Sequence, residues 1–122
     1  MINKIIFDLD DTLCFSIDKN YAEAIPNVSL VNKIKEYKKL GFHIVIFTSR
    51  NMNSYNNNIE LIKKNTLPKI TKWLKKNNII YDELIIGKPW CGPNGFYVDD
   101  RSIRPDEFIN LNYQQIKDII AK

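Results

Sequence analysis

Lys4-Ile5-Ile6-Phe7-Asp8-Leu9-Asp10-Asp11-Thr12-Leu13 is the stretch on which the rest of the chain depends. The apolar run that ends at Phe7 predicts a short buried strand of a parallel sheet. Carboxylates follow this run at once, at the point where open α/β sheets bind their ligands. Asp8 and Asp10 alternate with Leu9, so in an extended segment their side chains project to the same side. Because neighbouring carboxylates repel each other, the pair predicts a bound cation, and oxygen ligands favour Mg²⁺.

The composition is that of an ordinary globular protein. The chain has 122 residues, of which 44% are hydrophobic and 26% charged, and this predicts a single domain over residues 1–122. No apolar run approaches the roughly 18 residues of a membrane span, and the N-terminus lacks the layout of a signal peptide. Cys14 and Cys91 stand far apart, without a CxxC motif. We therefore expect free thiols, a cytoplasmic location and no membrane partner.

The chain has a net charge of +4, from 18 basic and 14 acidic residues. The first interpretation is that this charge keeps the protein soluble. Attraction for anionic substrates is the alternative. The lysines are spread over predicted helices and are not interleaved with aromatic residues, so we do not expect nucleic acid as a partner. They are Lys33, Lys35, Lys38, Lys39, Lys63, Lys64, Lys69, Lys72, Lys75 and Lys76.

Hydrophobic periodicity predicts strands that alternate with helices. The further strands are expected at 42–47, 83–86 and 95–98, and the helices at 27–40, 59–77 and 113–121, with a helical turn at 105–108. We expect Ser29 to cap the first helix, Gly41 to end it, and Pro68 to kink or restart the second helix. Alternating strands and helices predict crossover connections and a parallel sheet. Residues 14–26 form either a small flap over the site or a plain connector.

Polar residues follow each of the four predicted strands. They are Asp8 and Asp10, Thr48, Lys88, and Asp99 with Asp100. Because the carboxyl ends of parallel strands share one edge of a sheet, these side chains are expected to converge although they are far apart in sequence.

These motifs resemble, in order and type, those of the haloacid dehalogenase-like (HAD) superfamily, most of whose members are Mg²⁺-dependent phosphatases. The segment 8–12 resembles the DxDxT signature, and the resemblance extends over residues 5–101. It implies a three-layer, Rossmann-like parallel sheet with helices on both faces. The gaps between the motifs have room for little beyond a loop and a helix, so the chain resembles members without a cap domain.

The resemblance assigns the reacting groups and the metal ligands. Asp8 is expected to be the nucleophile that forms an aspartyl-phosphate, and Asp10 the general acid and base. Mg²⁺ is expected between Asp8, the backbone carbonyl of Asp10 and an acid of the last motif. We favour Asp100 as the direct ligand and Asp99 as its partner, and the sequence leaves the choice open.

The phosphoryl group is expected to be held by the second and third motifs. Thr48 would donate its hydroxyl, and Ser49 its amide, to a phosphoryl oxygen, while Lys88 offsets negative charge. Leu9, Ser49 and Arg50 are the expected phosphate-binding positions. Arg50 is also a candidate for a structural ion pair, as is Arg101, for which we favour this interpretation. Structural roles are expected for Asp11 and Thr12.

The strings at 48–52, 87–89 and 98–103 resemble small phosphatases of bacterial capsule and lipopolysaccharide biosynthesis. This implies a phosphorylated sugar or nucleotide-sugar conjugate as the substrate. A polynucleotide-type 3′-phosphatase, which is also capless, and a non-catalytic domain that binds a phosphorylated ligand are the alternatives. A site without a cap is open unless the flap, the Asn-rich loop or another subunit covers it, so a homo-oligomer is a further expectation.

Overall fold

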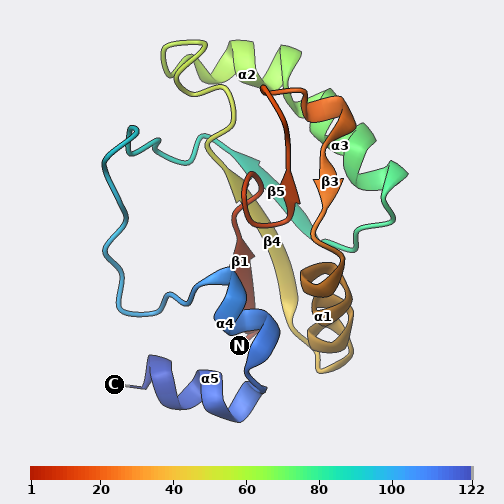
Figure 1. Cartoon of the computed structure of the whole chain (residues 1–122), viewed down its shortest axis with the longest axis vertical. Coiled ribbons are helices and arrows are strands. Elements are labelled where there is room, and N and C mark those ends of the chain that lie inside the picture. The colour runs from red at the N-terminus through yellow and green to blue at the C-terminus, as the bar shows by residue number, and fades with distance from the viewer. Residues whose placement is uncertain (122) are drawn as a thin grey trace. The chain divides into compact units, whose positions relative to one another are not determined.

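The computed structural model describes residues 1–121, in two compact units that we treat separately, Met1–Trp90 and a unit that begins at Cys91. The first unit contains a three-stranded parallel sheet in the order β1-β4-β5 (Figure 1). Its strands are β1 (Lys4–Phe7), β4 (His43–Thr48) and β5 (Glu83–Ile86). A mixed α/β fold with a parallel sheet flanked by helices, compatible with a Rossmann-like fold, is thereby confirmed. The assignment of residues 1–122 to one domain stays a prediction.

The helices of the first unit are the crossovers of this sheet. α1 (Val28–Lys39) connects β1 to β4, and α2 (Ile59–Asn65) with α3 (Leu67–Lys76) connects β4 to β5. The two crossovers step across the sheet in the same direction, and right-handed crossovers of this kind cover the same face. Figure 1 shows α1 and α3 on the same side of the strands.

The two faces of the sheet differ in burial. Phe7 and Ile46, which are register partners, are buried on one face. Ile6 is 62% exposed and Ile85 is 44% exposed on the opposite face. The expectation that β1 is buried along its length is therefore wrong at Ile6, which lies on an edge strand of this sheet, whereas its register partner Val45 on the central strand β4 is buried. Helices on both faces, and hence three layers, stay a prediction.

Residues 14–26 form a small folded flap and not a plain connector. β2 (Cys14–Phe15) pairs antiparallel with β3 (Ile25–Pro26), and a 3₁₀ turn, η1 (Tyr21–Glu23), lies between them. The indole Nε1 of Trp73 donates a hydrogen bond of 3.0 Å to the carbonyl of Ala24. This bond joins the flap to the buried side of α3.

The second predicted helix is two helices, as Pro68 allowed. α2 ends at Asn65, Thr66 separates it from α3, and Pro68 occupies the first turn of α3. Proline fits that position because its missing N–H has no helical partner there. Trp73 and Leu74 of α3 are buried in the core.

The cap of α1 is not the residue expected. The side chain of Asn27 accepts a hydrogen bond of 3.4 Å from the Leu30 amide, whereas Ser29 lies inside the helix. Asn27 also donates a hydrogen bond of 3.1 Å to the Thr12 carbonyl, so it joins the helix to the turn that follows β1. Gly41 has a φ of +98°, which confirms the expected end of the helix.

We predict that Asn27→Ala lowers the free energy of unfolding by about 1 kcal/mol, because the cap and the bond to the turn are both lost. Ser29→Ala is the matched control, since Ser29 caps nothing, and it should change stability by less than about 0.5 kcal/mol. Urea unfolding followed by circular dichroism measures both. Equal losses in the two variants would show that Asn27 is not the functional cap.

The second unit contains α4 (Pro105–Asn110) and α5 (Tyr113–Ile120), which confirms both predicted helical segments. The strand expected at 95–98 is wrong, because no strand is described between residues 91 and 121. Val98 is 89% exposed, so the apolar run finds no partner strand to bury it. The chain also bends sharply here, since any side chain at Gly95 would collide with the Cys91 carbonyl. Among the helices of residues 1–121, none has the length and apolar character that a bilayer span requires.

Candidate active site

The turn after β1 is specified by its own backbone. The Leu9 carbonyl accepts hydrogen bonds from the amides of Thr12, Leu13 and Cys14, at 3.3, 2.8 and 3.3 Å. Asp11 has a φ of +63°, a conformation that Asp tolerates better than most residues. The side chains of Leu9 and Leu13 are fully buried in the core. They hold in place the turn that carries the carboxylates.

Asp8 faces the end of β5 and carries a desolvated carboxylate. The Lys88 ammonium lies 3.4 Å from Asp8 Oδ1, and the Thr12 hydroxyl donates a hydrogen bond of 3.3 Å to Oδ2. Burial raises the pKa of Asp8, and Lys88, the Leu9 amide and Thr12 each lower it by less. The Lys88 amide donates to the Thr48 carbonyl at 3.1 Å, so the ends of β4 and β5 are joined as the sequence predicted.

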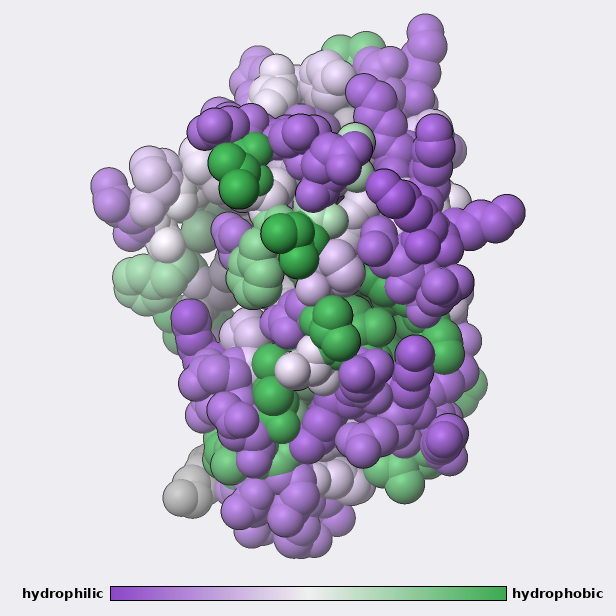
Figure 2. Space-filling model, turned by 45° about the vertical axis from the view of Figure 1, so that its right-hand side comes forward, coloured by the Kyte–Doolittle hydropathy of each residue, from purple (hydrophilic) through white to green (hydrophobic). Residues whose placement is uncertain are grey.

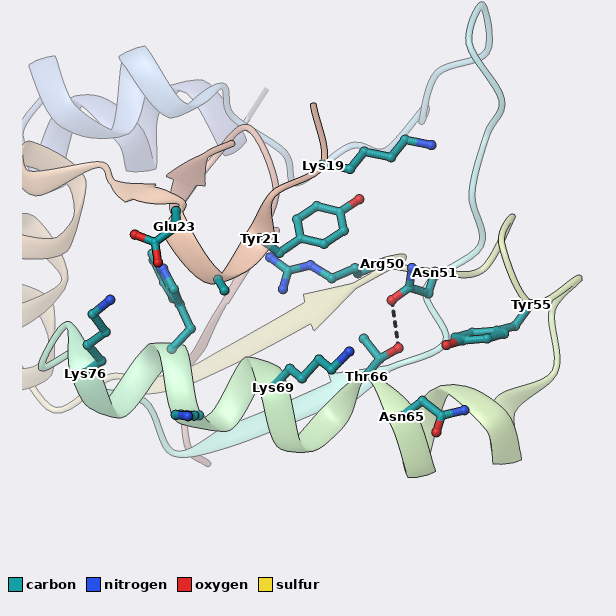
Figure 3. Close-up of a pocket in the computed structure, with 13 residues that line it drawn as sticks. Lys19, Tyr21, Glu23, Arg50, Asn51, Tyr55, Asn65, Thr66, Lys69 and Lys76 are labelled. Atoms are coloured by element: carbon teal, nitrogen blue, oxygen red, sulfur yellow. Dashed lines mark hydrogen bonds between the residues drawn. The ribbon is translucent and has the colours of Figure 1, made fainter. Parts of the chain in front are cut away.

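Asp10 is held by a buried arginine. Arg50 Nε donates to Asp10 Oδ2 at 3.1 Å and Nη2 donates to Oδ1 at 2.8 Å. The Arg50 side chain is 3% exposed, and the Arg50 Cζ atom lies 4.1 Å from the centroid of the Tyr21 ring (Figure 3). Of the two interpretations open for Arg50, the structure shows the ion pair. No sequence pattern indicated Tyr21, whose contact depends on how the flap folds back.

Thr48 is buried at the end of β4 with its hydroxyl oriented by the next residues. Its Oγ1 accepts a hydrogen bond of 3.0 Å from the Arg50 amide, which leaves the hydroxyl proton able to donate to a ligand. Ser49, between them, is half-buried. This geometry fits the phosphoryl-binding role expected for Thr48.

Cys14 lies beside the carboxylates but is not a nucleophile. Burial, with a smaller contribution from the charge of Asp10, raises the pKa of the thiol to about 12. Its Sγ donates a weak hydrogen bond to Asp10 Oδ1 at 3.7 Å. Because the reactive form of cysteine is the thiolate, this thiol is inert at neutral pH.

The remaining expected metal ligands belong to the second unit. Asp99 accepts a hydrogen bond of 3.0 Å from the Arg101 amide, which is the main reason that its pKa is lowered. Among residues 1–121 no three His, Cys, Asp or Glu side chains form a ready metal cluster. Mg²⁺ needs only one or two carboxylates because it keeps several waters. The partly buried Asp8 carboxylate, opposed by one ammonium group, is an oxygen donor of the required kind.

Fold and site together define an α/β protein with two carboxylates and a lysine at the carboxyl edge of a parallel sheet. The chain is similar over 98% of its length to the crystal structure of an MCSG target from Vibrio cholerae, at 44% identity and a TM-score of 0.96, and it covers 98% of that chain. It therefore belongs to the same protein family as the Vibrio cholerae protein.

One more distant solved structure shares the fold. A chain of the Pnkp1/Rnl/Hen1 complex is 22% identical with a TM-score of 0.51, over 81% of this chain and 31% of that one. In a second structure, of the Pnkp1/Rnl/Hen1 RNA repair complex, the match is 20% identical with a TM-score of 0.49, over 70% and 26% of the two chains. No family model matches the chain, and neither does any curated protein.

Proposed function

We propose that the protein is a Mg²⁺-dependent phosphomonoesterase of the HAD-like superfamily that works through an aspartyl-phosphate at Asp8. The observation that best supports this is the Lys88 ammonium 3.4 Å from a partly buried Asp8 carboxylate. An anionic nucleophile approaches an anionic phosphoryl group only when its charge is offset, and Lys88 does this at the attacking oxygen. The expected roles of the other residues support the same reaction.

The reaction has two steps. Asp8 attacks phosphorus, the bond from phosphorus to the ester oxygen breaks, and Asp10 protonates the leaving alcohol. Asp10 then takes a proton from water, which attacks phosphorus, releases inorganic phosphate and restores the Asp8 carboxylate. Arg50 fixes the orientation of the Asp10 carboxyl group through two hydrogen bonds. The Thr48 hydroxyl and the Ser49 amide would hold a phosphoryl oxygen, near the turn at Leu9.

The metal completes the charge balance. The resemblance implies that Asp8, the Asp10 carbonyl and an acid of the last motif, Asp100 or Asp99, would hold Mg²⁺. When bound, the ion neutralises charge on the phosphoryl oxygens. We propose a phosphorylated sugar or nucleotide-sugar conjugate in the cytoplasm as the substrate, on the basis of the motif strings. A preference for 3′-phosphorylated oligonucleotides would instead indicate the polynucleotide-type activity.

The test measures phosphate release from p-nitrophenyl phosphate and a panel of sugar, nucleotide and oligonucleotide phosphates. We expect turnover with Mg²⁺, loss with EDTA and recovery when Mg²⁺ is added in excess. Mg²⁺ should also raise the melting temperature, since an ion at about 100 times its Kd stabilises the folded state by about 2.7 kcal/mol. Binding of phosphate esters without release of phosphate from any of them would favour the non-catalytic alternative.

A further inference from the structure

A groove of about 530 Å³ lies within the first unit, beside the carboxylate site. The flap supplies one wall and α3 the other, and Arg50 lies between them (Figure 3). A volume of about 300–1,000 Å³ is usual for sites that bind small molecules. The proposed reaction uses only the edge of the groove formed by Arg50, so the rest has no assigned role.

The groove is lined by lysines that have no acidic partner. Lys69, Lys72 and Lys76 follow one another on one face of α3, and Lys19 comes from the flap, whereas Glu23 is the only acidic residue in the lining. None of these four lysines forms an ion pair within residues 1–121. Figure 3 shows Lys69 and Lys76 extending from α3 toward the flap. Figure 2, in which this side of the molecule comes forward, shows largely hydrophilic side chains there. Such unbalanced positive charge in a hollow attracts anions.

Arg50 connects this groove to the reacting groups. Its Nε and Nη2 atoms bond to Asp10, while Nη1 has no hydrogen-bond partner within residues 1–121. The side chain is 3% exposed yet lines the groove, so its free edge can reach a ligand only there. A molecule in the groove could therefore contact the same guanidinium group that bonds to the Asp10 carboxylate.

We propose that this groove binds a second phosphate group of the substrate, and that the substrate is a small molecule with at least two phosphates on a hydroxylated scaffold. The inference rests on the proposed function, because the first phosphate is the one released at Asp8. Lysine ammonium groups bind phosphate as point charges, and Glu23 can accept hydrogen bonds from hydroxyl groups.

The aromatic residues of the groove favour a small molecule over a nucleic-acid strand. Grooves that bind single strands stack successive bases on open aromatic rings. Here the Arg50 guanidinium covers one face of the Tyr21 ring, and Trp73 is buried and bonded to Ala24. Only Tyr55 is left as a half-buried ring in the lining.

The first test titrates inorganic pyrophosphate by calorimetry, in EDTA and low salt. Lys69→Ala/Lys72→Ala should weaken binding about tenfold relative to the wild type. The control Lys63→Ala/Lys64→Ala removes the same charge from α2, outside the groove, and should change the affinity less than about twofold. Unchanged affinity in the first variant, or equal weakening in both, would overturn the proposal. Affinity for oligonucleotides that rises steadily with their length would overturn the small-molecule assignment.

The second test compares two substrates. In Lys69→Ala/Lys72→Ala, kcat/KM for a nucleoside 3′,5′-bisphosphate should fall about tenfold more than kcat/KM for p-nitrophenyl phosphate. Equal falls would contradict a second phosphate site. If the wild type hydrolyses no ester, the proposed function and the substrate class fail together, while pyrophosphate binding still decides whether the groove is an anion site.

Discussion

Asp8→Asn should lower kcat for p-nitrophenyl phosphate by about 10⁴-fold or more, because the amide cannot form the acyl phosphate. The variant keeps the size of the side chain and its place beside Lys88, so what it removes is the nucleophilic oxygen and the charge. Initial rates with saturating Mg²⁺ measure the effect. A loss of less than about tenfold would rule out Asp8 as the nucleophile.

Asp11→Asn is the matched control for this variant. It makes the same chemical change three residues away, at an exposed position whose φ of +63° suits asparagine. We expect kcat within about threefold of the wild type, since surface substitutions away from special features have small effects. A large loss in Asp11→Asn would show that the turn is sensitive as a whole, and the Asp8 result would then say little about the nucleophile.

The stability of Asp8→Asn separates a lost nucleophile from a lost fold. Burial raises the pKa of Asp8 above its value in the unfolded chain, so its ionised form destabilises the folded state. Without metal, Asp8→Asn should therefore be at least as stable as the wild type at pH 7. The difference should close as the pH falls toward the unfolded value of about 3.9. Urea unfolding in EDTA at several pH values tests this, and a variant less stable at pH 7 would contradict it.

The residues that follow the strands were predictable because sheet geometry places them. Asp8 and Lys88 are 80 positions apart, yet parallel strands put both at one edge, and the apolar runs before them located those strands. The Asp10–Arg50 pair was left open, because the local sequence allows Arg50 to face a ligand or an acid. In the structure Arg50 bonds to the acid, and the position of its guanidinium under Tyr21 depends on how the flap packs.

Sequence patterns predict an element less well when the element depends on a neighbouring one. Residues 95–98 have the composition of a strand, but a strand also requires a neighbour to pair with, and composition says nothing of the neighbour. Ile6 shows the converse, since it lies in a parallel strand as predicted but is exposed, because β1 is at the edge of the sheet. Ser29 and Asn27 are both good caps by type, and the boundary of α1 decides between them.

The second large effect is expected for Arg50→Met, which removes the buried partner of Asp10. The two hydrogen bonds of 3.1 and 2.8 Å hold the Asp10 carboxylate, which is 30% exposed. Loss of the Arg50 guanidinium therefore leaves this carboxylate as a partly buried, unpaired charge. We expect the free energy of unfolding to fall by about 3 kcal/mol. Arg101→Met makes the same change at an exposed position and should cost less than about 0.5 kcal/mol.

A double-mutant cycle shows whether the pair itself is responsible. In an Asp10→Asn background, Arg50→Met should cost clearly less than in the wild type, because no carboxylate is left to desolvate. Arg50→Lys should recover part of the stability but less of the activity, since an ammonium group lacks the planar fork with which the guanidinium fixes the orientation of the carboxyl group. An equal cost in both backgrounds would mean that Arg50 stabilises the fold through its packing under Tyr21, and that the orientation of Asp10 has another origin.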